Sequence, residues 1–456
     1  MKMHCSNWQA FPKWTGLVSA ILFLLVQIPL HATIAIEAWT TGNGARVFFV
    51  QTHNIPILDV SVDFDAGSRY DPQNRAGLSS MTNMLLAGGI AASRHPSKEP
   101  ALTEAAISEG FADIGAQYSV YASPDRAGVR LRMLSDQEVS GKAVTLLARM
   151  LAQPSFPDSQ FQRDRKRAIS AIRESLTQPD AIAARAFMEV LYGTHPYAFS
   201  PTPETLASIR RSDLVSFHAA HYVAETAVIS IVGDASRERA EAIAEELSMR
   251  LKRSRDSRVS LELPEVEPGL TRESFIAHPS VQSHILIGMP ALARGDPDFF
   301  ALTVGNYILG SGGFVSRLMQ EVREKRGLSY SVYSQFDPRI QKGPFIIGLQ
   351  TKTEQTEEAV AVARDTLEAF MRDGPTQAEL KSAISHLVDS FPLRKDNNSK
   401  VLSLVSTIGF YGLPLDYLNS WPDRIQEVGI QDVRDAFSRK LLPGQLSTVI
   451  VGQKPE

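Results

Sequence analysis

The feature that most constrains this chain is an internal repeat, because two halves of the sequence carry matching segments in the same order. The tetrapeptide YSVY occurs at 118–121 and again at 330–333. An IVG triplet closes the first half within VISIVGDAS (228–236), and a second closes the chain within LSTVIVGQK (446–454). Two matches at nearly the same separation indicate a duplicated unit, and therefore two domains with one fold.

Each half begins with strands. In ILDVSVDFDAG (57–67) apolar residues alternate with polar ones, Leu58, Val60, Val62 and Phe64 against Asp59, Ser61, Asp63 and Asp65. This period of two predicts a strand with one buried face, which favours antiparallel pairing. The counterpart is SHILIGMPAL (283–292), and helices follow at 77–88 and 299–309. We expect an α+β fold of two homologous lobes, each a mainly antiparallel sheet packed with helices, which together form a clam-shell.

A chain of 456 residues is too long for one ordinary core, which agrees with two domains. The charged, proline-bearing stretch at 251–270 has no sustained period and is expected to be a linker. The predicted domains are therefore 36–250 and 271–456, after a signal peptide at 1–35.

The signal peptide is predicted from Lys2 and Lys13, the apolar run at 16–30 and the small residues that follow it. The run is shorter than the about 20 residues that span a bilayer, so an uncleaved anchor is the less favoured alternative. Cys5 is the only cysteine and precedes the run, so the mature chain would have no disulfide and no thiolate metal ligand. We expect a periplasmic protein whose only membrane contact is the signal segment before cleavage.

The net charge argues against a nucleic acid as the partner. Lys and Arg number 47 against 50 Asp and Glu, a net charge of −3, whereas nucleic-acid binders show a strong basic excess. The densest basic run, RDRKR (163–167), lies in a helical pattern. A solvated helix face explains it, with an anionic partner as the alternative.

The richest local string is GSGGFVSRLMQEVREKRGLSYSVYSQF (310–336). Its glycines allow close backbone approach and could present amides to a ligand, but a turn between helices is the favoured explanation of Gly310, Gly312 and Gly313. The following segment predicts a helix ended by Gly327, with four residues on its buried side: Val315, Leu318, Met319 and Val322. Arg323 and Tyr330 could bind a peptide carbonyl or carboxylate, but taken alone they suit a surface arginine and a core-facing tyrosine.

The segments at 43–89 and 310–336 resemble the two signature regions of the insulinase/pitrilysin family of zinc peptidases, which includes the mitochondrial processing peptidase. Residues 195–234 are similar to the family's end-of-domain pattern. The resemblance covers nearly the whole mature chain, and it implies the same duplicated α+β halves that the repeat predicts.

The sequence departs from that family at the residues that bind its metal. Active members have H-x-x-E-H on the first helix, in which two His bind zinc and the Glu activates water. Aligned on Gly77 and Leu78, these positions fall at Ser80, Asn83 and Met84, and the later Glu ligand falls near Ala171. None of these side chains can bind zinc or act as the base in place of its counterpart in the active members. His218 and His221 are three apart, but no third ligand or carboxylate base accompanies them, and the remaining histidines are scattered. We therefore predict no catalytic residue and no metal in this chain.

The resemblance also implies that Arg323 and Tyr330 match the family's substrate-contacting pair, with the glycines at 310–313 bordering the opening for a peptide. In bacterial two-subunit members, zinc and substrate-binding residues can be divided between chains. The resulting hypothesis is a non-catalytic subunit, inert alone. A related partner with H-x-x-E-H would supply zinc and base, and extended or unfolded peptides would be the substrates. The alternatives are a peptide-binding or assembly protein without proteolysis, and an independent hydrolase with an unrecognised site.

Overall fold

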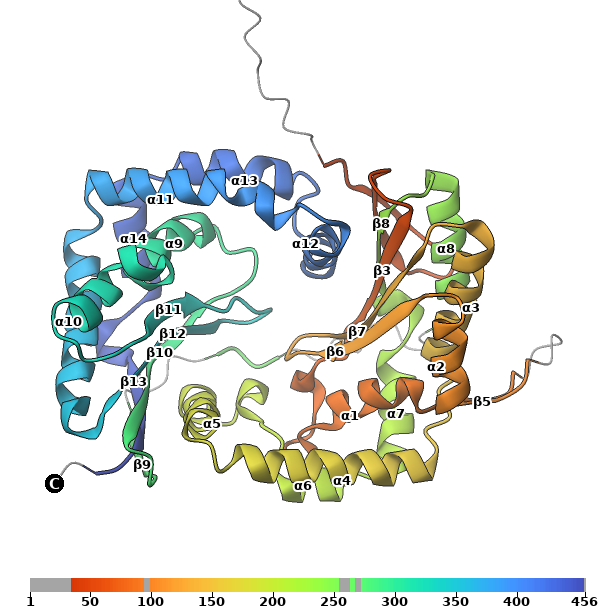
Figure 1. Cartoon of the computed structure of the whole chain (residues 1–456), viewed down its shortest axis with the longest axis horizontal. Helices are drawn as coiled ribbons and strands as arrows, with labels where there is room; N and C mark the ends of the chain where they lie inside the picture. Colours follow the sequence, from red (N-terminus) through yellow and green to blue (C-terminus); the bar gives the residue numbers. More distant parts are fainter. Residues whose placement is uncertain (1–33, 94–98, 254–262, 267–271, 455–456) are drawn as a thin grey trace, which may run out of the picture. The chain divides into compact units, whose positions relative to one another are not determined.

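Each half of the chain builds one sheet, shown in Figure 1. The computed structural model describes residues 34–93, 99–253, 263–266 and 272–454, so the run at 16–30, Cys5 and most of the predicted linker lie outside the described residues. The first sheet has the order β1 (Glu37–Thr40), β2 (Arg46–Gln51), β8 (Val228–Gly233), β3 (Ile57–Phe64), β7 (Ala127–Leu134), β6 (Gln117–Ala122). The second has the order β11 (Val332–Phe336), β12 (Gly343–Lys352), β10 (Gln282–Leu292), β13 (Ser447–Gly452), β9 (Glu273–Ala277).

The two sheets share one topology. In the first sheet, β8 carries the IVG triplet and lies beside the long strand β3, which is followed by β7 and the edge strand β6. In the second sheet, β13, β10, β12 and β11 occupy the same positions in the same order. Pairing is antiparallel except between β2 and β8 and between β9 and β13. In each YSVY segment the second tyrosine lies across from a glycine of the neighbouring strand, Tyr121 from Gly128 and Tyr333 from Gly348. The expected α+β class with two sheet-containing lobes is confirmed.

Helices pack around both sheets. Those of the first half are α1 (Leu78–Met84), α2 (Glu104–Ala112), α3 (Gln137–Ala152), α4 (Asp158–Ser175), α5 (Pro179–Tyr192), α6 (Pro203–Ser208), α7 (Arg211–His221) and α8 (Arg237–Met249). Those of the second half are α9 (Phe299–Asn306), α10 (Thr356–Asp373), α11 (Gln377–Asp389), α12 (Asn398–Tyr411), α13 (Tyr417–Gln426) and α14 (Ile430–Lys440). A short ribbon of β4 (Gly89–Ile90) and β5 (Leu102–Thr103) follows α1. No described helix is both long enough and apolar enough to cross a bilayer.

Local sequence explains where several helices begin. Asp136 caps α3 by accepting hydrogen bonds from the main-chain N–H groups of Glu138 and Val139, both at 3.0 Å. Thr376 and Glu379 form a reciprocal capping box at the start of α11. Such caps satisfy donors that a first helical turn leaves without a partner.

The polar face of β3 is buried, contrary to the prediction of one buried face. Asp59 is 4% exposed, and Ser61 and Asp63 are both 0% exposed. The cause is α12, which belongs to the second half of the chain yet packs against β3 and β8 of the first sheet (Figure 1). The polar residues of β3 therefore mark a contact between the two halves rather than a solvated surface.

The exchange of helices is mutual. From the first half, α5 packs on β10 and β13 of the second sheet, where Phe187 and Leu191 join a cluster with Val449 and Val451. On the other side, a Cβ atom at Gly409 of α12 would lie 2.6 Å from the Phe48 ring, so only glycine permits this approach. Because each half completes the core of the other, residues 34–456 form one compact unit.

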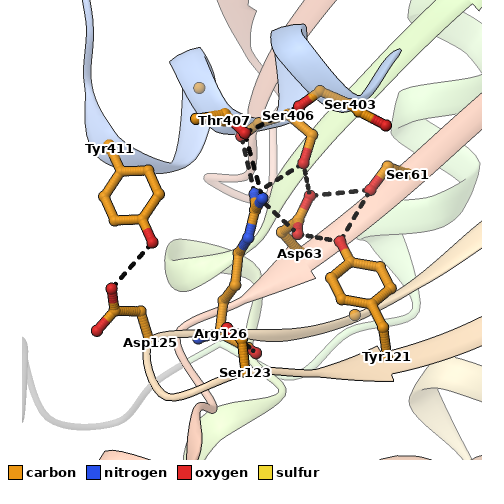
Figure 2. Close-up of polar contacts among 12 residues, drawn as sticks. Ser61, Asp63, Tyr121, Ser123, Asp125, Arg126, Ser403, Ser406, Thr407 and Tyr411 are labelled. Carbon is orange, nitrogen blue, oxygen red and sulfur yellow. Dashed lines mark hydrogen bonds and ion pairs between the residues drawn. The ribbon is translucent and has the colours of Figure 1, made fainter. Parts of the chain in front are cut away.

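A buried polar network joins α12 to the first sheet, as Figure 2 shows. Arg126, in the β6–β7 turn, lies 3.2 Å from Asp63 of β3 and donates to Ser406 Oγ of α12 at 2.7 Å. Ser406 Oγ donates to Asp63 at 2.8 Å, and Tyr121 also donates to this carboxylate. The buried charge of Asp63 is thus paired and hydrogen-bonded, as burial of a charge requires.

The neighbouring residue makes a second connection. Asp125 accepts hydrogen bonds from the hydroxyl groups of Tyr197 at 2.7 Å and of Tyr411 in α12 at 2.9 Å. It also accepts from the main-chain N–H of Ile340 at 3.0 Å. Burial and the Asp125 charge raise the pKa of both tyrosines, so they stay protonated donors. One turn of the first half is therefore fixed to two segments of the second.

Candidate functional site

The first helix holds the residues at the positions of the family's metal site. α1 begins after Gly77, whose φ of 103° is in the left-handed region that glycine favours. Its N-terminal N–H groups are bound by the buried Asp71 carboxylate, which accepts from Gly77 and Ser79, each at 2.8 Å. The helix is thus held firmly, and its sequence decides which side chains reach the site.

Asn83, at the position of the family's catalytic Glu, is buried and fully used in hydrogen bonds. Its Nδ2 donates to the main-chain oxygens of Tyr121 at 2.7 Å and Gly128 at 3.1 Å. Its Oδ1 accepts from the hydroxyl of Tyr222 at 3.0 Å. The amide therefore connects α1 to the edge of the sheet and is 1% exposed. A neutral, buried amide in this arrangement activates no water.

The second half contains the same device. Asn306, at the end of α9, donates to the main-chain oxygen of Ser334 in edge strand β11 at 3.1 Å and accepts from Ser334 Oγ at 2.7 Å. Asn83 thus makes the same contact as Asn306, its counterpart in the second half, where no metal site is expected.

Two of the other positions line a pocket. Ser80 and Met84 are exposed on α1, and Ala171 is exposed on α4. Met84 and Ala171 line one cavity of about 460 Å³ together with Gly88, Tyr118, Val120 and Arg167. We call this cavity the α1–α4 pocket. The fold therefore brings together two of the four positions that the resemblance singled out, with a thioether and a methyl group where ligands would stand.

The two carboxylates of the α1–α4 pocket are already paired. Arg163 of α4 donates to both oxygens of Glu104, at 2.6 and 2.8 Å, and to both oxygens of Asp164, at 2.7 and 2.8 Å. The bonds from Arg163 lower the pKa of Glu104. Neither carboxylate is free for a metal, and the donors that are left do not fit zinc, which takes N, S or O ligands in a tetrahedron.

The histidines of α7 are structural. The ring of His218 lies 2.8 Å from the main-chain oxygen of Leu151 and stacks on Tyr222, and burial lowers its pKa to about 4. His221 contacts the main-chain oxygen of Asp65 at 3.0 Å. Across the part of the chain that the structure describes, no group of three His, Cys, Asp or Glu side chains is arranged to hold a metal ion.

Arg323 and Tyr330 are joined through the main chain. Arg323 Nη1 donates to the carbonyl oxygen of Tyr330 at 2.8 Å, and its guanidinium lies 4.7 Å from the centre of the Phe314 ring. The Tyr330 side chain is 85% exposed, so it does not face the core. Arg323 therefore fixes the segment that presents Tyr330, and the phenol ring is open to a ligand.

The glycines and the following helix differ in part from expectation. Gly310 lies in η6 (Tyr307–Ser311), where a Cβ atom would be 2.4 Å from Ser334 Oγ, so close packing on β11 explains this glycine. Gly312 connects to η7 (Gly313–Val315), and Gly313 has a φ of 63°. The prediction that Val315 is buried was wrong: it is 58% exposed because it lies in η7, before the helical turns that bury Leu318, Met319 and Val322.

Each half of this duplicated α+β fold has a short helix and an edge strand, and the position of the metal carries no ligand. Together these features define a degenerate peptidase scaffold. Comparison with known families agrees. Residues 46–200 match the family described as Insulinase (Peptidase family M16), and residues 208–387 match Peptidase M16 inactive domain. The chain belongs to the M16 peptidase family and is an inactive member of it.

Similar proteins support this assignment. The crystal structure of a peptidase M16 inactive domain from Pseudomonas fluorescens has 33% identity and a TM-score of 0.85, and the match covers 92% of this chain and 98% of that one. The Non-peptidase homolog YmxG of Helicobacter pylori is 24% identical, over 95% of this chain and 98% of that protein. The Uncharacterized zinc protease YmxG of Bacillus subtilis is 26% identical, over 81% of this chain and 86% of that protein.

Sequence reasoning missed Asp125 and Arg126, which connect the two halves. A signal was present, since β3 carries Asp59, Ser61 and Asp63 on one face, and several polar residues on a central strand need a buried partner. Nothing in the sequence identified α12 as that partner, because it lies more than 300 positions further along the chain.

Proposed function

We propose that this chain is the non-catalytic, substrate-binding subunit of a periplasmic zinc metallopeptidase heterodimer. A related partner chain with H-x-x-E-H supplies the zinc ion and the Glu base. This chain contributes surfaces that hold extended or unfolded peptides while the partner cleaves them.

The observation that carries the proposal is the contrast between α1 and its surroundings. Asn83 at the base position is consumed by hydrogen bonds to Tyr121, Gly128 and Tyr222. Beside it, β6 ends the first sheet as an edge strand, and the α1–α4 pocket remains open. A chain that has lost the chemistry of a peptidase and kept a surface for an extended chain suits binding rather than cleavage.

Arg323 and Tyr330 support the same role. Arg323 holds the main chain at Tyr330, and Tyr330 offers an exposed ring and hydroxyl. Within a heterodimer, such preplaced donors orient a peptide backbone and stabilise developing negative charge on its carbonyl oxygen. The periplasmic location rests on Lys2, Lys13 and the apolar run at 16–30.

The test is to express the mature chain alone and together with a related chain that carries H-x-x-E-H, then to measure zinc content and cleavage of unfolded peptides. We expect no stoichiometric zinc and no cleavage from the chain alone, and chelator-sensitive cleavage from the pair. Chelator-sensitive cleavage by the lone chain would contradict the proposal.

A second candidate is a peptide-binding or assembly protein that acts without proteolysis. The edge strand and the pocket favour it, because both belong to this chain and need no partner. Under this alternative the chain binds peptides with the same affinity with or without the related chain, and the mixture cleaves nothing.

A further inference from the structure

The second sheet ends in a strand that lacks most of the features by which proteins protect a sheet edge. β9 lies at one end of this sheet and, among the described elements, has extensive contacts with β13 alone (Figure 1). It contains no proline, lysine or arginine, and its register with β13 runs over five residue pairs without a bulge. Because prolines, charges and bulges are what usually blunt an edge strand, β9 presents a regular and open edge.

Two hydrogen bonds at the ends of β9 determine which of its main-chain groups face β13. The carbonyl of Arg272 accepts from Thr448 at 2.8 Å, and the N–H of His278 donates to Gly452 at 2.9 Å. Since every second residue of a strand bonds to the same neighbour, three residues between these ends direct their N–H and C=O groups away from β13. Within the part of the chain that the structure describes, nothing bonds to these outward groups, which belong to Glu273, Phe275 and Ala277.

Phe275 is the central residue of this free edge. It lies across from Ile450 of β13, which packs against the core of the second half. Cross-strand neighbours project from the same face of a sheet, so the Phe275 ring lies on the core face. The side chain is nevertheless 42% exposed, because no strand lies beyond it. A further strand at this edge would cover the ring and continue the core face.

The sequence of β9 is complementary to a second copy of itself. When two β9 strands pair antiparallel about a two-fold axis at Phe275, the outward residues of one strand meet those of the other. Phe275 then lies opposite Phe275 of the second copy, and Glu273 lies opposite Ala277. Every outward N–H and C=O group of both strands gains a partner. A register shifted by two residues would leave outward groups at the ends without one.

Charge favours the same register. Glu273 is the only charged residue of β9. In the two-fold register its two copies lie about 13 Å apart along the strands, which is the rise of four residues, and each carboxylate is opposite the methyl group of Ala277. Parallel pairing would place the two carboxylates side by side, and like charges directly opposite destabilise a strand pair.

We propose that β9 is a self-association edge, at which two copies of this chain join their second sheets through antiparallel pairing of residues 273–277. The partner is thus a second copy of this chain. The inference does not depend on the proposed function. β11, which follows Tyr330, lies at the opposite end of the same sheet, so the association leaves Arg323 and Tyr330 open.

Single cysteines test the register. The only cysteine of the chain is Cys5, so a Cys5→Ser background is free of thiols. In this background, chains with Glu273→Cys and chains with Ala277→Cys are oxidised with diamide, each alone and as a mixture. Because a strand edge by itself buries less surface than the roughly 1,200 Å² of a stable complex, the protein is used at about 0.1 mM.

Opposite residues of a hydrogen-bonded antiparallel pair have Cα atoms about 5.5 Å apart, which is within the range that a disulfide spans. We therefore expect a disulfide-linked dimer in the mixture and its loss when either chain is oxidised alone. A mixture without the dimer, or equal cross-linking of each chain alone, would overturn the proposal.

Matched substitutions test the centre of the edge. Phe275→Lys places two lysines opposite each other, whereas Phe275→Tyr keeps an aromatic pair, and neither removes a main-chain bond to β13. In sedimentation velocity at the same concentration, we expect dimers of the parent chain and of Phe275→Tyr, and loss of the dimer in Phe275→Lys. A dimer of Phe275→Lys as abundant as that of the parent would refute the assignment. Circular dichroism checks the fold of each variant, and the cysteine cross-links decide alone if Phe275→Lys does not fold.

The outcome is separable from that of the proposed function, because the self-association is measured on this chain alone and without a substrate. A parent chain that stays monomeric at this concentration would overturn the self-association and leave the heterodimer untouched. Cross-links of the expected register, combined with a related chain that yields no cleavage, would remove the heterodimer and leave the self-association.

Discussion

Asn83 and Asn306 make the same contact in the two halves: each side-chain amide donates to a main-chain oxygen of the edge strand that follows its helix. The position at which active relatives carry a catalytic Glu is therefore a structural position here. A Glu at this position would lose the two hydrogen bonds that the Asn83 amide nitrogen donates, because a carboxylate has no N–H group.

Asn83→Ala should destabilise the chain by about 1–3 kcal/mol, because the buried Tyr222 hydroxyl and two main-chain oxygens lose their partner. Urea unfolding followed by circular dichroism measures the change. Ser80→Ala, on the exposed side of the same helix, is the control and should stay within about 0.5 kcal/mol. Equal stability of both variants would show that Asn83 is dispensable.

Asp63→Ala should cost about 3–5 kcal/mol, since it leaves the Arg126 guanidinium, which is only 13% exposed, without its carboxylate. The double variant Asp63→Ala/Arg126→Ala should cost less than the sum of the single variants, because the two charges share one network. The exposed pair Lys400–Asp396 in the same region offers a control, and Asp396→Ala should leave the unfolding midpoint unchanged. Strict additivity would mean that the Asp63–Arg126 pair contributes nothing.

The stability of the chain should fall as the pH is lowered from about 6.5 to 4, in part because of His218. Its pKa in the folded state is lowered to about 4 by burial, so the unfolded chain takes up a proton first as the pH falls. The contribution is complete above the ordinary histidine pKa of about 6.5, and about 3 kcal/mol is lost by pH 4. In urea unfolding across this range, His218→Gln should show a shallower decline than the parent chain. Parallel curves for the two proteins would contradict this origin.

Metal removal should have no effect on the isolated chain. Met84 and Ala171 provide no ligand, and the carboxylates of the α1–α4 pocket are bound by Arg163. We expect EDTA to leave the melting temperature unchanged and elemental analysis to find no stoichiometric zinc. A chelator-dependent melting temperature would show a metal site that the described residues do not form.

Tyr330→Ala should weaken peptide binding without lowering stability, because the ring is 85% exposed. Arg323→Ala should weaken it as well, through the lost hydrogen bond to the Tyr330 carbonyl. In a heterodimer, Arg323→Ala and Tyr330→Phe should lower turnover and leave the zinc content unchanged. If both variants cleave at the parent rate, the role assigned to this pair is wrong.

The sequence predicted the parts of the fold that depend on local pattern. The alternation in β3 and the repeated YSVY and IVG segments indicate the strands and the duplicated unit, because each strand carries its own apolar face. The substitutions at Ser80, Asn83 and Met84 could be found by resemblance alone. The hydrogen bonds of Asn83, the opening of the α1–α4 pocket and the burial of Asp63 could not, because each depends on residues far away in the chain.

The mutual exchange of α5 and α12 has a consequence for how the chain is made. The first sheet stays uncovered on one face until residues 398–411 are available, and α5 has no docking surface until β13, close to the last residue, has been synthesised. Neither lobe is therefore a self-sufficient folding unit, and the long separation of these contacts favours slow, late folding. A premature stop before α12 should leave the first sheet uncovered, and a stop between α12 and β13 should leave α5 without β13 to pack on, so either product should be a target for proteolysis.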